Sequence, residues 1–360
     1  MQMMIFDDQG KRIGILQNYT SIQWKRKYAE PGQFEIHVRP TKENLANIKE
    51  GVTRFVNQAT QEIGFVSFFH DEESEDEAQG DIEIRGYMDN LDQRINIRTW
   101  HFGTNVESDV MDCIQFNQRD LDIYFAPDPQ GLQVTGLDME STWETLRDTV
   151  QLVCEQTGLG YRMLADKLAG KSPEALNQFG MYNGKKRNVK FSDKLSNITF
   201  QSVVRDLSDY KNFAYVCAQG EGEERTVVEV DLSNGGERYE LYVDSRNTSK
   251  KYTDESGNEQ TYTDEEYQNV LHNEGLEALA EHSAVIQFSV TIDPNDPLFR
   301  FRIDYDLGDI VIVESVKYNI QNTLYRISGI NEIEEDGVET IEIELTLYAE
   351  EASAKKGVTV

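Results

Sequence analysis

The sequence predicts a mainly β protein in which two β-barrel-like domains flank a domain of mixed α and β structure. Apolar and polar residues alternate with a period of two near both ends of the chain, which is typical of half-buried strands. After residue 105 the apolar residues recur at helical spacing instead. A chain of 360 residues also exceeds what one hydrophobic core usually organises, so several packed units are expected.

The first domain begins with a predicted hairpin. Residues 21–28 and 33–39 alternate between apolar and polar side chains, and Pro31 and Gly32 lie between them. Proline presets φ at one corner of a tight turn, and we expect Gly32 to accept a positive φ at the next corner. Further strands are predicted at residues 54–56, 63–69 and 81–86. These strands are enough for a small β-barrel or a curled sheet.

The middle of the chain predicts helices. Apolar residues at helical spacing follow Asn105, namely Val106, Val110, Cys113 and Ile114. A second helix is expected where Ser141 and Glu144 have the spacing of a capping box, and Gly158 and Gly160 are expected to end it. Residues 167–183 have the composition of a polar loop. This part of the chain therefore combines helices with strands.

Strand patterns return in the last part of the chain, at residues 198–207, 213–218 and 225–231. Residues 244–263 form a polar insertion that we interpret as a mobile loop. Thr263 and Glu266 then have the spacing of a capping box, for a helix that extends to about His282. The remaining predicted strands are residues 285–292, 301–305, 310–313, 324–330 and 341–348.

These elements predict three domains and a tail. The N-terminal β-barrel domain takes residues 1–104, and the mixed α/β domain takes residues 105–188. The second β-barrel domain takes residues 189–350 and contains the helical insertion, whose residues 244–283 could instead join the mixed domain. Residues 351–360 have no strong pattern and are predicted to be a flexible tail.

The chain is strongly acidic, with 65 aspartate and glutamate residues against 35 lysine and arginine residues and a formal net charge of −30. Tight binding to DNA is excluded, because affinity for phosphates comes from cationic side chains. No apolar run reaches the roughly 20 residues needed to span a membrane, and no basic segment precedes residues 1–6. We therefore expect a protein made in the cytoplasm, without a membrane span.

The sequence has no pattern typical of a catalytic or cofactor site. The five histidines, among them His37, lack an HExxH motif and a neighbouring nucleophile, and we interpret them as surface or structural groups. The three cysteines, Cys113, Cys154 and Cys217, lack a CxxC pairing, which predicts buried reduced thiols. No GxGxxG or Walker loop follows a strand. The prediction is a protein that is not an enzyme and has no cofactor.

Acidic residues close together could bind a divalent ion or act as a catalytic carboxylate pair. The closest candidates are Asp304, Asp306 and Asp309, and the pair Asp293 and Asp296. In so acidic a chain such spacings arise by chance. We therefore predict no metal ligand and no catalytic residue among them.

Several fragments of the sequence, taken in their order along the chain, resemble the baseplate hub family of long-tailed phages. These are the siphophage hub or tail-associated proteins, which are related in fold to the central myophage hub. The fragments include the first hairpin, the segment GYMDNLDQRI and the segment YDLGDIVIV. Their structural motif residues are Trp24, Pro31, Gly32, Phe34, Gly86, Arg94, Tyr305, Gly308 and Asp309.

Two of these residues also have a physical reason for their place. Gly308 would permit a sharp turn into the strand at residues 310–313. Arg94 is placed to satisfy carboxylates or carbonyl groups at a domain junction. For Trp24 and Phe34, packing in a core is the simpler interpretation. None of the nine is predicted to be catalytic, cofactor-binding or metal-ligating.

The resemblance implies a hub-like homotrimer in which two similar barrel domains per subunit form a pseudo-six-fold ring at the tail tip of a virion. Such a ring would join the six-fold tail tube and distal tail protein to three-fold tip components. The implied partners also include the tape measure protein and downstream tail-tip or receptor-binding proteins. DNA would pass through the channel without specific binding, and an acidic channel wall would favour this.

Two other functions stay open. The chain could be a carbohydrate-binding or glycoside-cleaving β protein that acts on the host envelope, which a monomer with glycan-binding or cell-wall-cleaving activity would indicate. It could also be the hub of a tailocin or another injection machine, which the fold alone does not separate from a phage.

Overall fold

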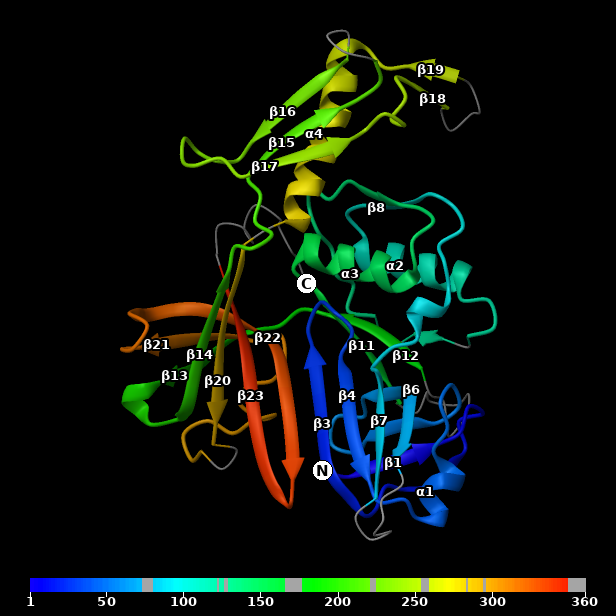
Figure 1. Ribbon diagram of the computed structural model, residues 1–360, viewed down its shortest axis with the longest axis vertical. Helices are drawn as coiled ribbons and strands as arrows, with labels where there is room; N and C mark the ends of the chain where they lie inside the picture. Colours follow the sequence, from blue (N-terminus) through cyan, green and yellow to red (C-terminus); the bar gives the residue numbers. More distant parts are fainter. Residues whose placement is uncertain are drawn as a thin grey trace. The chain divides into compact units, whose positions relative to one another are not determined.

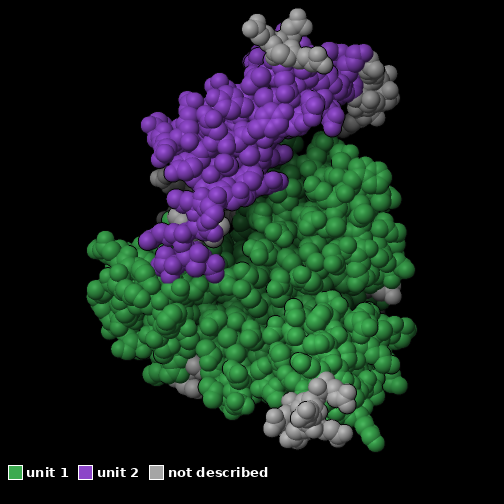
Figure 2. Space-filling view, viewed as in Figure 1, with its two compact units in different colours: residues 1–202, 288–360 green, residues 203–287 purple. Residues whose placement is uncertain are grey.

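The computed structural model describes residues 1–72, 80–121, 123–125, 129–165, 177–220, 225–253, 259–282, 284–293 and 296–348. The predicted tail at residues 351–360 lies outside the described residues. The chain divides into two compact units (Figure 2). The larger unit contains residues 1–202 and 288–360, and the smaller unit contains residues 203–287.

The larger unit is built on a 13-stranded sheet, most of whose neighbouring strands are antiparallel (Figure 1). The strand order is β14-β20-β23-β22-β3-β4-β7-β6-β5-β1-β2, and β21 lies between β22 and β13. The strands are β1 (Met3–Phe6), β2 (Arg12–Ile15), β3 (Tyr19–Lys27), β4 (Gln33–Val38), β5 (Arg54–Asn57), β6 (Ile63–Glu72), β7 (Asp81–Tyr87), β13 (Lys186–Ser192), β14 (Ile198–Asp206), β20 (Val285–Ile292), β21 (Ile310–Ser315), β22 (Ile320–Glu335) and β23 (Val338–Leu347).

One antiparallel pair joins the two ends of the chain into this single sheet. In it, β22 pairs with β3 from Gly329 opposite Lys27 to Glu335 opposite Ser21. Alternate residues of β3 are buried, as the period-two pattern predicts, and Trp24 is fully buried. The other side of β3 carries polar residues. The sheet therefore has a core side and a polar side.

The mixed region follows the first strands. Its helices are α2 (Val106–Asn117) and α3 (Leu146–Thr157), and α1 (Lys42–Asn47), η1 (Leu91–Gln93) and η2 (Asp193–Leu195) are short helical turns elsewhere in the larger unit. Its strands are β8 (Trp100–Phe102), β9 (Tyr124–Phe125), β10 (Met139–Ser141), β11 (Gly160–Leu164) and β12 (Gln178–Tyr182). Strands β11, β12 and β9 form one small sheet, and β10 and β8 form another.

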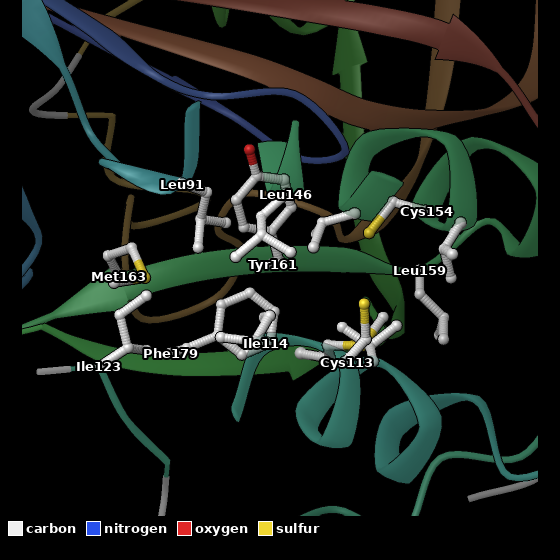
Figure 3. Packing of buried hydrophobic residues seen from close by; sticks show 14 of the residues in the cluster. Leu91, Cys113, Ile114, Ile123, Leu146, Cys154, Leu159, Tyr161, Met163 and Phe179 are labelled. Carbon is white, nitrogen blue, oxygen red and sulfur yellow. The ribbon is translucent and has the colours of Figure 1, made fainter. Parts of the chain in front are cut away.

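A shared hydrophobic core ties the mixed region to the first strands. Tyr161 on β11 stacks on Phe179 on β12 with 5.9 Å between the ring centroids, and both lie among side chains of α2 and α3 (Figure 3). The same cluster contains Val56 and Ile63 from β5 and β6. Core packing therefore crosses the predicted boundary at residue 104, and the three-domain division stays a prediction.

The start of α3 differs from the prediction. Thr145, not Ser141, is the N-cap residue, and its hydroxyl accepts a hydrogen bond from the Asp148 amide at 3.0 Å. Ser141 instead ends β10, and its hydroxyl donates to Glu144 at 2.8 Å. The predicted capping box is therefore wrong, because strand pairing takes Ser141. Gly158 ends the helix in the left-handed conformation, as predicted.

The smaller unit is a three-stranded sheet covered by one long helix. Its strands are β15 (Phe213–Cys217), β16 (Val227–Asp231) and β17 (Glu240–Asp244), in the order β16-β15-β17, and its helix is α4 (Asp264–Glu281). Thr263 and Glu266 form the predicted capping box, which is confirmed. Gly275 lets the helix approach the sheet, because a Cβ atom there would lie 2.6 Å from Val230. The smaller unit thus has a core of its own, in which the helix of the predicted insertion packs on strands that precede the insertion.

Three predicted segments, two loops and one strand, have a different structure from the one expected. Within residues 167–183, predicted as a polar loop, β12 buries Phe179 and Met181 against β11. Within residues 244–263, predicted as a mobile loop, β18 (Lys251–Thr253) and β19 (Glu259–Thr261) form a hairpin. Residues 301–305 are not a strand but a turn, in which Arg302 has a φ of 64°.

The predicted fold class, mainly β with a mixed α/β region, is confirmed. Closure of the strands into barrels stays a prediction. Cys113, Cys154 and Cys217 are buried and unpaired, as predicted, and burial raises the pKa of the Cys113 thiol to about 12. Among the described residues, no helix is long and apolar enough to cross a membrane.

Candidate functional site

Three residues chosen from the sequence lie in the core of the first half of the sheet. Trp24 on β3 stacks on Phe34 on β4, with 5.4 Å between the ring centroids. Phe34 lies opposite Gly86 on β7. A Cβ atom on Gly86 would overlap the Phe65 carbonyl oxygen and lie 2.7 Å from the Phe34 ring. The structure gives these residues packing positions, with glycine required where the ring crosses β7.

The hairpin turn keeps Pro31 and Gly32 between β3 and β4, but the expected role of Gly32 is wrong. Gly32 does not have a positive φ. A Cβ atom there would overlap Met88 and lie 2.8 Å from the Lys25 carbonyl oxygen. Its own carbonyl accepts a hydrogen bond from the Met88 amide at 2.8 Å. Glycine is therefore needed for close approach of the chain and not for a left-handed turn.

Arg94 follows η1, and its side chain reaches the segment after α2 in the mixed region. Its guanidinium donates to the carbonyl oxygens of Gln93 at 2.8 Å and Gln118 at 3.3 Å. It also forms an ion pair with Asp120, which the guanidinium holds at a pKa below its ordinary value. The contacts join η1 to the segment that follows α2.

Residues 305–309 form the turn into β21, where the last of the motif residues lie. Tyr305 is buried and packs edge-on against Phe191, 5.1 Å between ring centroids. Gly308 has a φ of 88°, which only glycine adopts without strain. The Asp309 carboxylate accepts from the Lys185 amide at 2.9 Å and from Arg187 Nε at 2.8 Å. This turn therefore fixes β13 beside β21.

Tyr28, at the end of β3, connects this turn to the mixed region. Its ring fills the space that Cβ atoms would occupy on Gly160 and Gly308. Its hydroxyl accepts from the Gly184 amide at 3.1 Å, and Arg326 lies 4.7 Å above its ring. One buried tyrosine thus contacts the N-terminal strands, β11 and the start of β21.

A group of charges around the buried Arg26, which we call the Arg26 cluster, lies next to Tyr28. It consists of Arg26, Glu62, Arg302, Asp306 and Glu332. Arg26 on β3 donates from Nε to Glu62 at 2.6 Å and from Nη1 to Asp306 at 2.7 Å. Its Nη1 lies 3.8 Å from Glu332 Oε1, and Arg302 pairs with the other Glu332 oxygen. The cluster joins β3, β6, β22 and the turn into β21.

The three carboxylates of the Arg26 cluster face only two cations, and Glu332 is the least stabilised. It is fully buried, and its Oε1 has no hydrogen-bond partner. Burial raises the pKa of Glu332 to about 6, although Arg26 and Arg302 oppose the rise. Burial also acts on Asp306, but Arg26 lowers the pKa of that carboxyl below its ordinary value. Glu332 is therefore the titrating member of the cluster.

This shift predicts a pH-dependent stability that Glu332→Gln removes. The unfolded carboxyl ionises near its ordinary pKa of 4.5, whereas the folded one keeps its proton to about pH 6. Stability from this group is therefore full below pH 4.5 and falls by about 2 kcal/mol as the pH rises to 6. In urea unfolding, the stability of Glu332→Gln relative to wild type should be greater at pH 7 than at pH 4.5.

The control for this measurement is Glu314→Gln. Two lysines, Lys190 and Lys194, lower the pKa of Glu314 to about 2, so its linkage to folding lies below pH 4.5. The stability of Glu314→Gln relative to wild type should change little between pH 4.5 and pH 7, and in the opposite direction, because the unfolded carboxyl is only half protonated at pH 4.5. A Glu332→Gln difference that stayed constant across that window would contradict the raised pKa.

We call the pairing of β3 with β22, where the two halves of the sheet meet, the junction. On the polar side of the sheet, two lysines bind one carboxylate across this junction. Lys25 and Lys27 on β3 lie 2.8 Å and 2.6 Å from the two oxygens of Glu344 on β23. Gly329 on the intervening β22 opens the path, because a Cβ atom there would lie 2.7 Å from Glu344. Despite burial, the lysines lower the pKa of Glu344. The junction is thus charge-paired on both sides of the sheet.

A second buried ion pair anchors the mixed region. Arg147 on α3 lies 2.7 Å from Asp89, just after β7, and the Tyr161 hydroxyl donates to Asp89 at 2.8 Å. Burial raises the pKa of Asp89, against the opposing effect of Arg147. Arg147 also lies above the Tyr87 ring at 4.5 Å. These contacts orient α3 on the end of β7.

Three of the five acidic candidates from the sequence form ion pairs with arginines. Asp304 pairs with Arg300, Asp306 with Arg26 and Asp309 with Arg187, and they do not share a strand face. The residues that sequence reasoning missed are Arg26, Glu62, Glu332 and Glu344. Arg26 could have been found from the sequence, because it occupies a core position in the alternating pattern of β3. No local sequence pattern distinguishes Glu62, Glu332 and Glu344 from the other glutamates.

Comparison with solved structures identifies the fold. The tail protein from Neisseria meningitidis MC58 has a TM-score of 0.56 over 98% of this chain and 99% of its own, at 11% identity. The prophage MuSo2 43 kDa tail protein from Shewanella oneidensis has a TM-score of 0.57 over 96% and 98%, at 12% identity. Both show the same fold. This chain therefore has the fold of these two phage tail proteins.

The family follows from the sequence comparison. Residues 2–346 match the model of the siphovirus ReqiPepy6 Gp37-like protein family, and the chain belongs to that family. The predicted membership of a siphophage tail-protein family is thereby confirmed. None of the curated proteins matches the chain significantly.

Proposed function

We propose that the protein is the baseplate hub of a phage tail tip, a homotrimeric ring that adapts a six-fold tail tube to three-fold tip components. The observation that carries this proposal is the sheet order. Four strands of the C-terminal half, β14-β20-β23-β22, continue into four strands of the N-terminal half, β3-β4-β7-β6 (Figure 1). Three copies would supply six such four-stranded sets, which matches the symmetry of a six-fold tube.

The two ends of this eight-strand path support closure into a ring. β14 ends the path, and among the described residues no strand pairs with its outer edge. At the other end β6 pairs with β5 over Ile63, Gly64 and Phe65, whereas residues 68–72 pair with β7 and with no other strand of the described residues. Unlike edges that meet head to tail generate closed rings when the rotation closes.

The charge of the polar face supports a path for DNA. We define this face as the side of β3, β4, β6, β7, β22 and β23 that is turned away from the core. Its carboxylates are Glu35, Glu72, Asp81, Glu83, Glu335, Glu342 and Glu344, and its lysine and arginine residues are Lys25, Lys27 and Arg85. If this net acidic face lines the channel, it repels DNA and lets it slide. A trimer whose channel wall was neutral or basic would overturn this assignment.

The test is the mass and shape of the purified protein. Mass photometry should give three times the chain mass of 41.3 kDa, and electron microscopy should show a three-fold ring with a central hole. In the proposed tail tip the ring contacts the distal tail protein, the tape measure protein and receptor-binding components. A monomer that binds or cleaves cell-wall glycans would overturn the proposal in favour of an envelope-active protein.

A substitution at the edge tests how the ring closes. Phe200 on β14 is 63% exposed, and a lysine there should disfavour strand pairing between copies. Phe200→Lys is expected to shift the trimer to monomers at micromolar concentration in mass photometry. The matched control is Val338→Lys, whose side chain is 66% exposed away from both edges. If both variants stay trimeric, β14 is not the edge that joins the copies.

A further inference from the structure

A histidine and two glutamates meet on the polar face of the sheet, where the sequence predicts no metal ligand. Glu35 and His37 are two residues apart on β4, so they point to the same side. Glu83 on β7 lies directly opposite His37. One ligand atom from each of the three residues lies within 4.8 Å of the other two. All three side chains are partly buried, and two paired strands hold their backbones.

A fourth residue orients the histidine. The Nδ1 atom of His37 lies 2.6 Å from an Asp81 oxygen, and its Nε2 atom lies 3.0 Å from Glu35. Histidines that ligate metals almost always donate the other ring N–H to a carboxylate or carbonyl group, which fixes the tautomer. Asp81 provides that partner and leaves Nε2 on the side of the two glutamates.

We propose that Glu35, His37 and Glu83 bind a divalent transition-metal ion of the Zn²⁺ class, with Asp81 as the residue that orients His37. One imidazole nitrogen with two carboxylate oxygens suits Zn²⁺, whereas Ca²⁺ and Mg²⁺ prefer oxygen ligands alone. Zinc–ligand distances of about 2.0–2.2 Å require the three ligand atoms to move closer together. Side-chain rotations can do this while the strands stay in place, and water completes the four ligands.

The charged neighbours of this site set its affinity. Arg85 on β7 forms an ion pair with Glu83, and its Nε lies 3.9 Å from Glu35. The guanidinium also lies 4.3 Å above the Phe68 ring. His70 on β6 is the cross-strand neighbour of Glu83. Arg85 therefore competes with a metal ion for the two carboxylates, so its removal should tighten metal binding.

The experiment titrates the full chain with Co²⁺ at pH 7.5 in 150 mM NaCl, followed by visible absorption, and then displaces Co²⁺ with Zn²⁺. We expect one tetrahedral Co²⁺ spectrum per chain. His37→Gln should weaken binding at least tenfold, and Arg85→Gln should strengthen it severalfold. The matched control is His101→Gln, because His101 on β8 has a similar contact with one exposed carboxylate, Glu140 at 2.9 Å.

Circular dichroism confirms that each variant is folded before it is titrated. Absence of a tetrahedral Co²⁺ band, or equal binding by His37→Gln and wild type, would overturn the site. Weaker binding by Arg85→Gln would also overturn it, because Arg85 pairs with two of the proposed ligands and its loss should free their carboxylates for the metal. Because stoichiometry is counted per chain, the result is independent of whether the protein forms a ring.

Discussion

Replacing Arg26 with methionine is expected to lower the free energy of unfolding by about 3–5 kcal/mol. The guanidinium is buried and contacts Glu62, Asp306 and Glu332. Methionine has a similar volume but leaves these carboxylates without their shared cation. Burial lowers the pKa of Arg26, but the carboxylates raise it well above its ordinary value, which is why the arginine stays charged. Urea unfolding at pH 7 measures the loss.

Two further variants test the cause of this loss. Arg300→Met removes an exposed arginine that pairs with Asp304, and should change stability by less than about 1 kcal/mol. The double variant Arg26→Met with Glu332→Gln also removes one of the carboxylate charges that lose their cation. It should therefore be more stable than Arg26→Met alone. If the double variant lost the sum of the two single effects, the carboxylates would not depend on Arg26 for neutralisation.

The elements that the sequence predicted correctly have local causes. Alternation along β3 and β4 follows from burial of one face, and the capping box of α4 needs only Thr263 and Glu266. The wrong predictions arise where two local patterns predict different structures for the same residue. Ser141 and Glu144 have the spacing of a cap, but Ser141 pairs in β10 and Thr145 takes the cap. The spacing of residues in the sequence does not decide whether Ser141 caps a helix or pairs in a strand, because the partner strand is not known from the local sequence.

The junction could not be predicted from local patterns, because its residues come from distant parts of the chain. Arg26 is a core-facing arginine in an alternating strand, which signals a buried ion pair but not its partners. Glu62 and Glu332 look like ordinary residues of a very acidic chain. Only the pairing of β22 with β3 brings Glu332 to Arg26. The same pairing puts Glu344 within reach of Lys25 and Lys27.

These charges give the junction a specific register. A shift of β22 by one residue along β3 would turn Glu332 to the polar face and leave Arg26 in the core without it. On the polar face the same shift would take Glu344 away from its two lysines. We therefore infer that the ion pairs select one alignment of the two halves of the sheet, in addition to any effect on stability. The proposed hub ring would need this alignment, because every copy would have to present its two edges at the same spacing.

Replacing Gly184 with alanine is expected to be the most damaging small change outside the Arg26 cluster, lowering the free energy of unfolding by roughly 2–4 kcal/mol. A Cβ atom on Gly184 would overlap the carbonyl group of Gly308 and lie 2.9 Å from the Asp309 amide nitrogen. These are backbone atoms, so no side chain can rotate to relieve the overlap. The segments before β13 and β21 must separate, which strains the hydrogen bonds from Gly184 to Tyr28 and from Lys185 to Asp309.

The matched control is Gly180→Ala on the neighbouring β12. A Cβ atom there meets no atom within 4 Å, and Gly180 does not have a positive φ. Alanine at this position should leave stability unchanged or raise it by about 0.5–1 kcal/mol, because it restricts the unfolded chain. Thermal and urea unfolding of both variants give the comparison. Equal stability of Gly184→Ala and Gly180→Ala would mean that the close approach of the two segments is not needed, and that Tyr28 alone holds the start of β21.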